Sequence, residues 1–544
     1  MFSDPFQILS NPERLASELM AMAFKCRLGD EELKQGIRVP FKFRKLLKAK
    51  KKKRPSLTPS GHLLASFLAN RFFNGQPWRF EFSVPKAVFL RKKETQKSYP
   101  FAGLSNAEKI DKVREGNAEF FSHWRMIGSV PIHDALVHRV LLSHLRQRID
   151  PYFSDFSHAY RADPRRFSVM SAVRQYEELG AIHPFIVKLD IVRFFDTIDH
   201  QTLAKLCRNM LHQAQFSRNE SNKLMVVIEK FMACAPRMLG YDPPVRRRSS
   251  KVVGPGGGIV SLLGGLALRF KNVVWKFVSS VLGKMSNAVG CFPGHSKGIV
   301  QGGALSTMLS NIYLHHFDKF MEKKGWRYLR YADDIVIFCH SYPQAVQRKD
   351  EAEQFLLAAL KLTCGDKVKV CEPFLDMDYL GCAFKNGIKS IRQKTIDKFR
   401  RKIKRLTRIG QISQKSGAPC KPTYVIQRIN NQLGFIRPPT AKSGGKRKCR
   451  FRVKYCWAKF IAAHHREFDG LDQEFKKMDR WIRSRLLKYW CAVRKCAVPT
   501  SKSEIHKMNR KFTRLGLRTV MEAYRRARAA MLAKQVDNGN RADS

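Results

Sequence analysis

A chain of 544 residues with 44% hydrophobic residues can bury roughly two to four domain cores, which excludes a disordered polypeptide. Its 102 lysine and arginine residues against 45 acidic residues give a net charge of +57. This charge is spread along the whole chain, which favours nucleic acid over a membrane surface as the partner. The thirteen cysteines are irregularly spaced and include no Cys-x-x-Cys pair, so no zinc site is predicted. With no leader peptide and no apolar run long enough for a membrane helix, the chain is predicted to reside in the reducing cytoplasm.

Residues 1–85 are predicted to form a basic helical region. Asn11 suits the N-cap of a helix whose first turn contains Pro12. The segment 42–54 then carries nine cations among thirteen residues. It is either an arm that contacts RNA phosphates or a solvated basic surface.

Two segments between residues 86 and 185 are informative. In the first, Trp124-Arg125-Met126 precedes a helical pattern that runs through Leu136 and Leu145. In the second, Arg161 follows a run rich in aromatic residues. An arginine held among aromatic rings is well placed to meet a phosphate or template backbone, and the alternative is a surface arginine at the boundary of an element.

The segment 185–191 is predicted to be a buried strand because it is almost continuously apolar. Asp190 lies at its end, and a carboxylate there needs a charged partner or a metal ion. Asp196 and Asp199 lie beyond the strand and are predicted to cap the following helix. The region of about 210–285 carries little pattern, and we expect its glycine-rich part to be a flexible loop.

A glycine-rich turn at Gln301 and Gly302 leads into a predicted helix with Leu305 and Leu309 on one side. The glycines would let another backbone or a base approach closely. The Gln301 side chain offers hydrogen bonds at the same place.

Two adjacent carboxylates, Asp333 and Asp334, interrupt the apolar segment 328–338. The β-branched and aromatic residues on both sides predict two short strands with the acidic pair at the turn between them. Adjacent carboxylates repel each other and are costly near a core unless a cation holds them, and a divalent metal is the simplest compensation. The alternative interpretation is an ordinary hairpin with an acidic tip.

The C-terminal part of the chain is predicted to be helical and basic from about residue 388. Helices are also predicted at 352–362 and at 471–490, the latter as the last strong helix of the chain. A strand and turn are predicted at 379–381. The basic loop at 442–454 is predicted to bind nucleic acid through four cations, Lys446, Arg447, Lys448 and Arg450.

If the two acidic strands are neighbours, Asp190, Asp333 and Asp334 form a site for two Mg²⁺ ions, with Mn²⁺ as an alternative metal. One ion would lower the pKa of an attacking 3′-hydroxyl, and the other would hold a triphosphate and stabilise the leaving oxygen. Carboxylates are suitable ligands because Mg²⁺ prefers oxygen donors and keeps waters and substrate phosphates around it.

These motifs, in this order, resemble the palm of reverse transcriptases, in particular the bacterial group II intron-like enzymes. The resemblance covers about residues 124–490 and rests on three motifs in combination. They are Lys-Leu-Asp-Ile-Val-Arg-Phe-Phe-Asp-x-Ile-Asp-His around Asp190, Gln-Gly-Gly-Ala-Leu-Ser from Gln301, and Tyr-Ala-Asp-Asp from Tyr331.

The resemblance implies an α+β right-hand polymerase fold with an antiparallel palm sheet that carries the catalytic aspartates, followed by an α-helical thumb. After the N-terminal region, the expected parts are fingers at 86–185, a palm at 186–385 with an insert at about 210–285, and a basic thumb or maturase-like domain at 386–544. The N-terminal region and the insert are candidate surfaces for self-association.

The resemblance also implies roles for individual residues. Asp190, Asp333 and Asp334 match the catalytic metal ligands, to which the backbone carbonyl of Ile191 would add. Phe195 matches the bulky residue that excludes a ribose 2′-hydroxyl and so implies deoxynucleotide substrates. Arg125 matches the residue that neutralises the incoming triphosphate, and Lys367 matches the lysine that helps pyrophosphate leave. Gln301 and Gly302 match the turn under the nascent base pair. Arg161 matches an arginine of the fingers.

Three departures from the intron enzymes bear on the biological role. Asp190 and Gln301 are 111 positions apart, the residues before Trp124 do not align with the intron fingers, and no His/Cys endonuclease tail follows the thumb. These departures resemble the stand-alone bacterial reverse transcriptases often found in antiviral, anti-phage defence systems, which act with a dedicated non-coding RNA. The predicted function is therefore an RNA-directed DNA polymerase that uses dNTPs and a structured non-coding RNA and yields a DNA product.

Two other functions stay open on the sequence. The first is a group II intron-encoded maturase that acts mainly as an RNA-binding splicing factor, and the intact carboxylates of Asp190, Asp333 and Asp334 disfavour it. The second is an RNA-dependent RNA polymerase, which shares the palm chemistry and is disfavoured by Phe195.

Overall fold

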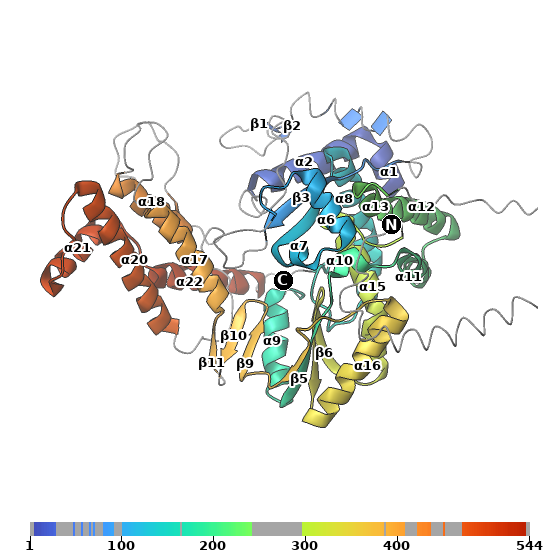
Figure 1. The fold of residues 1–544 in the computed structure, drawn as a ribbon. Helices are drawn as coiled ribbons and strands as arrows, with labels where there is room; N and C mark the ends of the chain where they lie inside the picture. Colours follow the sequence, from blue (N-terminus) through green and yellow to red (C-terminus); the bar gives the residue numbers. More distant parts are fainter. Residues whose placement is uncertain are drawn as a thin grey trace, which may run out of the picture. The chain divides into compact units, whose positions relative to one another are not determined.

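The computed structural model describes residues 5–28, 47–48, 56–57, 62, 65–66, 69–70, 80–91, 101–163, 166–241, 296–385, 388–408, 421–436, 450–451 and 471–539. The chain divides into two compact units, whose elements are labelled in Figure 1. Unit 1 comprises Met1–Ser168 and Val187–Val370, and unit 2 comprises Val169–Ile186 and Cys371–Ser544. The division into N-terminal region, fingers, palm and thumb stays a prediction.

Unit 1 begins with two helices, α1 (Pro5–Ser10) and α2 (Pro12–Leu28), on either side of Asn11. The Asn11 side chain accepts hydrogen bonds of 3.0 Å from the backbone amides of Glu13 and Arg14, which confirms the predicted N-cap. Two short strands pair antiparallel further on, β1 (Leu47–Lys48) and β2 (Ser56–Leu57). The rest of the basic segment 42–54 lies outside the described residues.

An antiparallel strand pair follows, with Lys86 of one strand opposite Ser129 of the other. Trp124 and Phe120 belong to the apolar cluster that covers this pair. The helix that the apolar periodicity predicted follows this pair, and it ends in a short 3-10 turn. The elements are β3 (Lys86–Arg91), α6 (Asn106–Glu115), α7 (Ala118–His123), β4 (Trp124–Ser129) and α8 (Ile132–Ile149).

A four-stranded sheet is the centre of unit 1. Its strand order is β6-β7-β5-β8, so the two strands predicted to carry carboxylates are neighbours. The side chains of Ile335, Val336, Ile337 and Phe338 are fully buried, because helices cover the sheet. The strands are β5 (Phe185–Asp190), β6 (Arg327–Tyr331), β7 (Asp334–Cys339) and β8 (Lys369–Cys371).

Helices from three parts of the chain pack around this sheet. The described part of the predicted insert, residues 210–241, is mainly helical. Its helix α12 packs on α11, and α11 packs on α15. The helix predicted at 352–362 is longer than expected. It begins at Tyr342, and the Ser341 side chain forms its N-cap. The helices are α10 (Phe194–Thr197), α11 (His200–Gln213), α12 (Arg218–Met232), α13 (Cys234–Met238), α15 (Ala304–Lys323) and α16 (Tyr342–Leu360).

The two aspartates beyond β5 differ in their roles. The Asp199 carboxylate accepts a 2.9 Å hydrogen bond from the amide of Thr202 and caps α11, as predicted. Asp196 instead lies inside α10 and pairs with Arg193 at 3.2 Å. The prediction that both residues cap the helix was therefore right for Asp199 and wrong for Asp196.

Unit 2 combines one helix from residues 169–186 with a small sheet and a set of helices. The turn predicted at 379–381 joins two strands of a three-stranded antiparallel sheet in the order β11-β10-β9 (Figure 1). The elements are α9 (Val169–Gly180), β9 (Asp376–Tyr379), β10 (Cys382–Lys385), β11 (Ile388–Ile391), α17 (Gln393–Leu406), α18 (Pro422–Gln432), β12 (Phe435–Ile436), β13 (Arg450–Phe451), α20 (Leu471–Arg494), α21 (Lys502–Arg514) and α22 (Val520–Gly539).

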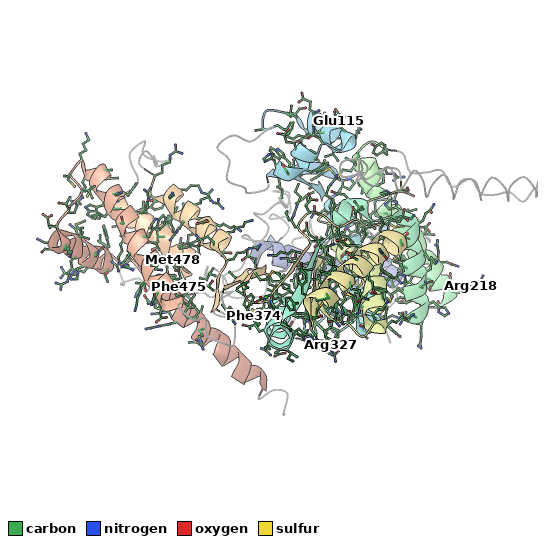
Figure 2. The ribbon with its side chains drawn as sticks, turned by 60° about the horizontal axis from the view of Figure 1, so that its bottom comes forward. Glu115, Arg218, Arg327, Phe374, Phe475 and Met478 are labelled. Carbon is green, nitrogen blue, oxygen red and sulfur yellow. The ribbon has the colours of Figure 1, made fainter. Side chains whose placement is uncertain are left out.

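Helix α20 is the long helix predicted at 471–490, and Phe475 and Met478, labelled in Figure 2, belong to its buried face. The expectation that it is the last strong helix was wrong, because α21 and α22 follow it. The Asp479 carboxylate of α20 accepts a 2.7 Å hydrogen bond from the amide of Val520 at the start of α22. None of the described helices has both the length and the apolar composition that crossing a bilayer requires.

Candidate active site

The acidic pair lies at the tip of the β6–β7 hairpin. Tyr331 pairs with Asp334, so the loop between the strands consists of Ala332 and Asp333 only. Ala332 has a positive φ of 57°, as two-residue hairpin loops require. Asp333 is half-buried and Asp334, the first residue of β7, is exposed. The predicted hairpin with an acidic turn is therefore confirmed.

Asp190 is the last residue of β5, the strand next to β7. Burial raises the pKa of the Asp333 carboxyl above its usual range, and the charges of Asp334 and Asp190 raise it further, whereas the Arg125 guanidinium lowers it. The structure thus brings three carboxylates and one arginine within electrostatic range of each other. Such a group of negative charges is relieved either by protonation or by a bound cation.

The carboxylates fit a divalent metal ion that is coordinated partly by the protein and partly by a bound substrate. Within the described ranges, no group of three His, Cys, Asp or Glu side chains is arranged to hold a metal ion on its own. Mg²⁺, however, is commonly bound by one or two carboxylates and completes its shell with waters and substrate phosphates. Asp190, Asp333 and Asp334 would be the protein ligands of such an ion. The part assigned to the Ile191 carbonyl stays a prediction.

The Gln301 turn is fixed against strand β4. The Gln301 carbonyl accepts a 2.9 Å hydrogen bond from the amide of Gly128, three residues after Arg125. Gly302 has a φ of 104°, and a Cβ there would lie 2.8 Å from Cγ2 of Ile127, so only glycine fits. The exposed Arg125 side chain and the Gln301 turn therefore belong to one continuous piece of structure.

Phe195 lies in α10, five residues after Asp190, and is half-buried. Its carbonyl accepts a 2.8 Å hydrogen bond from the amide of Ile299, which places α10 beside the segment that leads to Gln301. Its ring contacts the ring of Phe194 edge-on, with 5.4 Å between centroids. The structure thus places Phe195 beside the segment that leads to Gln301, and its role as a sugar gate stays a prediction.

Lys367 is exposed in a turn that follows Gly365. The amide of Gly365 donates a 2.8 Å hydrogen bond to the carbonyl of Asp190, and the amide of Val192 donates a 3.0 Å bond to Thr363. The segment that carries Lys367 is therefore joined directly to the end of β5. Sequence patterns gave no indication of the contact between Gly365 and Asp190, because it joins residues 175 positions apart.

Arg161 lies among aromatic rings as predicted, but its environment differs from the one that contact with nucleic acid would need. Its guanidinium stacks on Phe167 at 3.8 Å and is paired with Asp150 at 3.1 Å. It also donates to the carbonyls of Asp150, Ser154 and Ser157. With only 7% of its surface exposed, Arg161 is committed to the protein, which favours a structural role over contact with nucleic acid.

The predicted basic loop lies largely outside the described residues. Lys446, Arg447 and Lys448 fall in the range 437–449, which the structure does not describe. Arg450 begins the short strand β13 and pairs with Ile436 of β12. The part assigned to these four cations in nucleic-acid binding stays a prediction.

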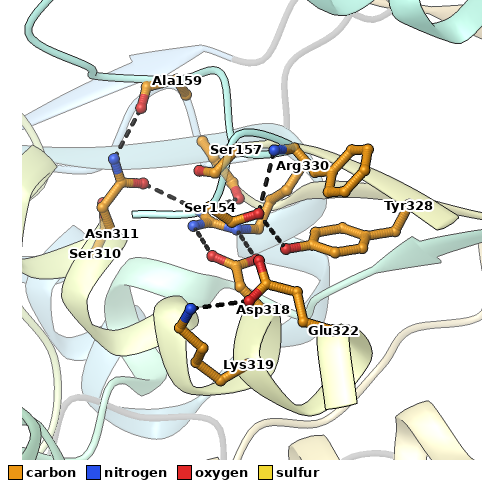
Figure 3. A network of polar contacts seen from close by, with 12 residues as sticks. Ser154, Ser157, Ala159, Ser310, Asn311, Asp318, Lys319, Glu322, Tyr328 and Arg330 are labelled. Atoms are coloured by element: carbon orange, nitrogen blue, oxygen red, sulfur yellow. Dashed lines mark hydrogen bonds and ion pairs between the residues drawn. The ribbon is translucent and has the colours of Figure 1, made fainter. Parts of the chain in front are cut away.

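A buried ion pair, shown in Figure 3, joins strand β6 of the hairpin to helix α15. Arg330 and Asp318 have no exposed side-chain surface, and the guanidinium donates to both carboxylate oxygens, at 2.8 and 2.5 Å. Arg330 also donates to the side-chain oxygen of Asn311 at 3.0 Å and to the carbonyl of Ala332 at 3.4 Å. The pair therefore links α15 to the backbone of the hairpin turn. No sequence signal distinguished Arg330 from the many other arginines.

Tyr160 is another residue near the hairpin that the sequence patterns did not reveal. Burial raises the pKa of its phenol, and the neighbouring charges of Asp333 and Tyr331 raise it further, whereas Arg125 lowers it. Tyr160 has a positive φ of 62°, which is uncommon for an aromatic residue and cannot be read from sequence. The ring thus belongs to the same group as Asp333 and Arg125.

Comparison with known proteins adds two findings. Residues 267–384 match the family model described as reverse transcriptase (RNA-dependent DNA polymerase), a range that includes Gln301, Gly302, Asp333, Asp334 and Lys367. An alignment over 286 positions, which covers 45% of this chain, is 23% identical to Protein YkfC of Escherichia coli strain K12. The chain spans 59% of the length of that relative.

Asp190, Phe195 and Arg125 lie before the matched range, so their assignment rests on the geometry and the sequence motifs. Reverse transcriptases use divalent metal ions, a nucleic acid template and dNTPs, and the clustered carboxylates suit the metal. The matched range is thus similar to the domain of an RNA-directed DNA polymerase, which is a nucleotidyltransferase.

Proposed function

We propose that the chain copies RNA into DNA by transferring nucleotides from dNTPs to a 3′-hydroxyl. The observation that carries this proposal is that Asp334, Asp190 and Arg125 all lie within electrostatic range of Asp333. The charges of Asp334 and Asp190 raise the pKa of the Asp333 carboxyl, which favours a bound cation, and the adjacent guanidinium favours phosphate oxygens. The family match over residues 267–384 supports the same reaction.

Each side chain in this group would have a separate task. Asp190, Asp333 and Asp334 would hold Mg²⁺, which when bound supplies Lewis acidity towards the 3′-hydroxyl and the triphosphate. Arg125 would offset the charge of the triphosphate. The Phe195 ring would stand beside the sugar and exclude a 2′-hydroxyl.

The remaining residues would support the base pair and the leaving group. The turn of Gln301 and Gly302 would lie under the nascent base pair, where its rigid attachment to β4 fixes its position. Lys367, an exposed cation on the segment bonded to Asp190, would meet the departing pyrophosphate.

The nucleic acid partner is proposed to be a structured non-coding RNA that is used in anti-phage defence in the cytoplasm. Helix α17 supports an RNA partner, because it buries Ile396, Phe399 and Ile403 and exposes basic residues. Its exposed cations are Lys394, Lys398, Arg401, Lys402, Lys404 and Arg405. Such a helix face suits the phosphate backbone of RNA.

Identification of the RNA that copurifies with the chain tests the biological role. A discrete short RNA encoded beside the gene agrees with the defence role. An excised intron lariat would show instead that the chain acts as a maturase.

Replacing Lys398, Arg401 and Arg405 by glutamine should weaken binding of the RNA that copurifies with the chain. The salt dependence of binding should also flatten, by about 0.7–0.9 in log–log slope for each phosphate that is no longer neutralised.

The decisive experiment for the catalytic proposal is the double substitution Asp333→Asn with Asp334→Asn. We expect it to abolish dNTP incorporation on a primed RNA template and to leave RNA affinity unchanged, because neither residue belongs to the basic surface of α17. Asp350→Asn, an exposed acid on α16, is the matched control and should retain full activity. Polymerisation by the double variant would show that the site is assigned wrongly.

A further inference from the structure

Tyr160 occupies the tip of a loop that runs alongside strand β6. Ser157 of this loop pairs in parallel with Arg330, and the amide of His158 donates a 2.9 Å hydrogen bond to the Arg330 carbonyl. Because Arg330 is followed by Tyr331 and the acidic turn, this pairing brings the tip of the loop beside the turn. The charges of Asp333 and Arg125 both act on the Tyr160 phenol, which agrees with this placement.

The residues on both sides of Tyr160 are fixed by buried side chains. The carbonyl of Ala159 accepts a 2.8 Å hydrogen bond from the Asn311 amide, whose oxygen is held by Arg330 (Figure 3). Arg161 is buried and engaged by Asp150 and by three backbone carbonyls. Tyr160 therefore cannot relax its positive φ without breaking buried hydrogen bonds.

A strained backbone that is fixed from both sides commonly serves a function. Here it turns an aromatic side chain out of the core, so that 37% of the residue is exposed. The side chains within electrostatic range, Arg125 and Asp333, are those assigned to the triphosphate and the metal ion. The parts of a nucleotide next to its triphosphate that an aromatic ring can contact are the sugar and the base.

We propose that Tyr160 contacts the sugar and base of the incoming deoxynucleotide and thereby helps to position it for transfer. This inference rests on the proposed polymerase function. Aromatic rings bind nucleotides by stacking on a base or packing against a sugar, and such contacts tolerate any base. Tyr160 would therefore act on nucleotide affinity without selecting one nucleotide over another.

Steady-state incorporation of a single dNTP on a primed RNA template tests the proposal with three variants. Tyr160→Phe keeps the ring and should behave as the wild type. Tyr160→Ala should raise the KM for each dNTP by about tenfold, with a smaller effect on kcat and an unchanged affinity for primer–template. Tyr160→Gly should raise KM equally while relieving the strained φ, so its thermal stability should not fall.

Two controls separate the possible outcomes. Tyr342→Ala removes an exposed tyrosine at the start of α16 and should leave KM unchanged. A wild-type chain that does not incorporate dNTPs overturns the polymerase function and this inference together. An active wild type whose Tyr160→Ala variant keeps its KM, or binds primer–template more weakly instead, overturns only the inference about Tyr160.

Discussion

The amide of Gly365 donates a 2.8 Å hydrogen bond to the carbonyl of Asp190, and this contact brings the glycine close to the carboxylate that we propose as a metal ligand. A Cβ added at Gly365 would lie 3.3 Å from Oδ2 of Asp190 and 3.2 Å from Cγ2 of Val192. Either distance requires a neighbour to move by a few tenths of an ångström. The position of the Asp190 carboxylate therefore depends on a glycine, Gly365, in a distant part of the sequence.

We expect Gly365→Ala to reduce kcat for dNTP incorporation by about tenfold, since small displacements of catalytic groups are costly. RNA affinity should not change. Gly103→Ala is the matched control, because a Cβ at Gly103 meets nothing within 4 Å. Full activity of Gly365→Ala would show that the Asp190 carboxylate adjusts at no cost to catalysis.

Phe195→Ala should admit ribonucleotides. Removing the ring would open space beside the sugar, and we expect discrimination between dNTPs and NTPs to fall at least about tenfold, a free-energy difference of about 1.4 kcal/mol. The measurement is the ratio of kcat/KM for a dNTP and the matching NTP. An unchanged ratio would show that Phe195 does not determine sugar specificity.

Breaking the ion pair between Arg330 and Asp318 should destabilise unit 1 strongly. Asp318→Ala would leave Arg330 as an uncompensated buried charge, and we expect a decrease of about 3–5 kcal/mol in the free energy of unfolding. Replacing both residues by apolar ones, as in Asp318→Leu with Arg330→Met, should recover a large part of this decrease. Urea unfolding, with hydrogen exchange in β6 and β7 as the local probe, measures both changes. Equal instability of the single and double variants would show that the uncompensated charge is not the cause.

The stability of the N-terminal half should depend on the protonation of Asp134 in α8. Burial raises the pKa of this carboxyl to about 7, although the amide of Ser83 donates to it at 3.0 Å. A pKa raised in the folded state means that the stabilisation is fully present below about pH 4 and is lost as the pH rises through about 7.

Asp134→Asn should remove this pH dependence, because an amide keeps the acceptor for Ser83 and does not ionise. The difference in Tm between the Asp134→Asn variant and the wild type should therefore grow from pH 4 to pH 7 in favour of the variant. Comparing the two proteins cancels the opposite effect of His138, whose pKa burial lowers to about 3. A pH-independent difference in Tm would show that Asp134 is charged at pH 5 or below.

The parts that could be predicted from sequence are those in which neighbours along the chain supply the signal. The apolar run before Asp190 and the acidic turn at Asp333 and Asp334 each lie in one short segment, and both formed as predicted. The Asn11 and Asp199 caps are local in the same way. Their physical cause acts within a few residues, so no tertiary information is needed.

The parts that could not be predicted depend on distant partners or lack a pattern. Arg161 and Arg330 look like surface cations in the sequence, and only Asp150 and Asp318 reveal that they are buried. Helix α22 was missed because its buried face includes the small residues Ala523 and Ala527, which form no conspicuous apolar stripe. Positive φ angles at non-glycine residues, as at Tyr160, leave no trace in the sequence.

The hydrogen bond between Gly128 and the Gln301 carbonyl has a consequence for the kinetics of nucleotide entry. Arg125 lies on the same strand as Gly128. The cation proposed for the triphosphate and the turn proposed for the base pair therefore cannot separate without breaking this bond. Nucleotide capture at this edge should then involve side-chain rotation alone, without a strand that opens and shuts. Stopped-flow binding of a dNTP should accordingly show a single concentration-dependent phase, with no slower step for closure of this strand.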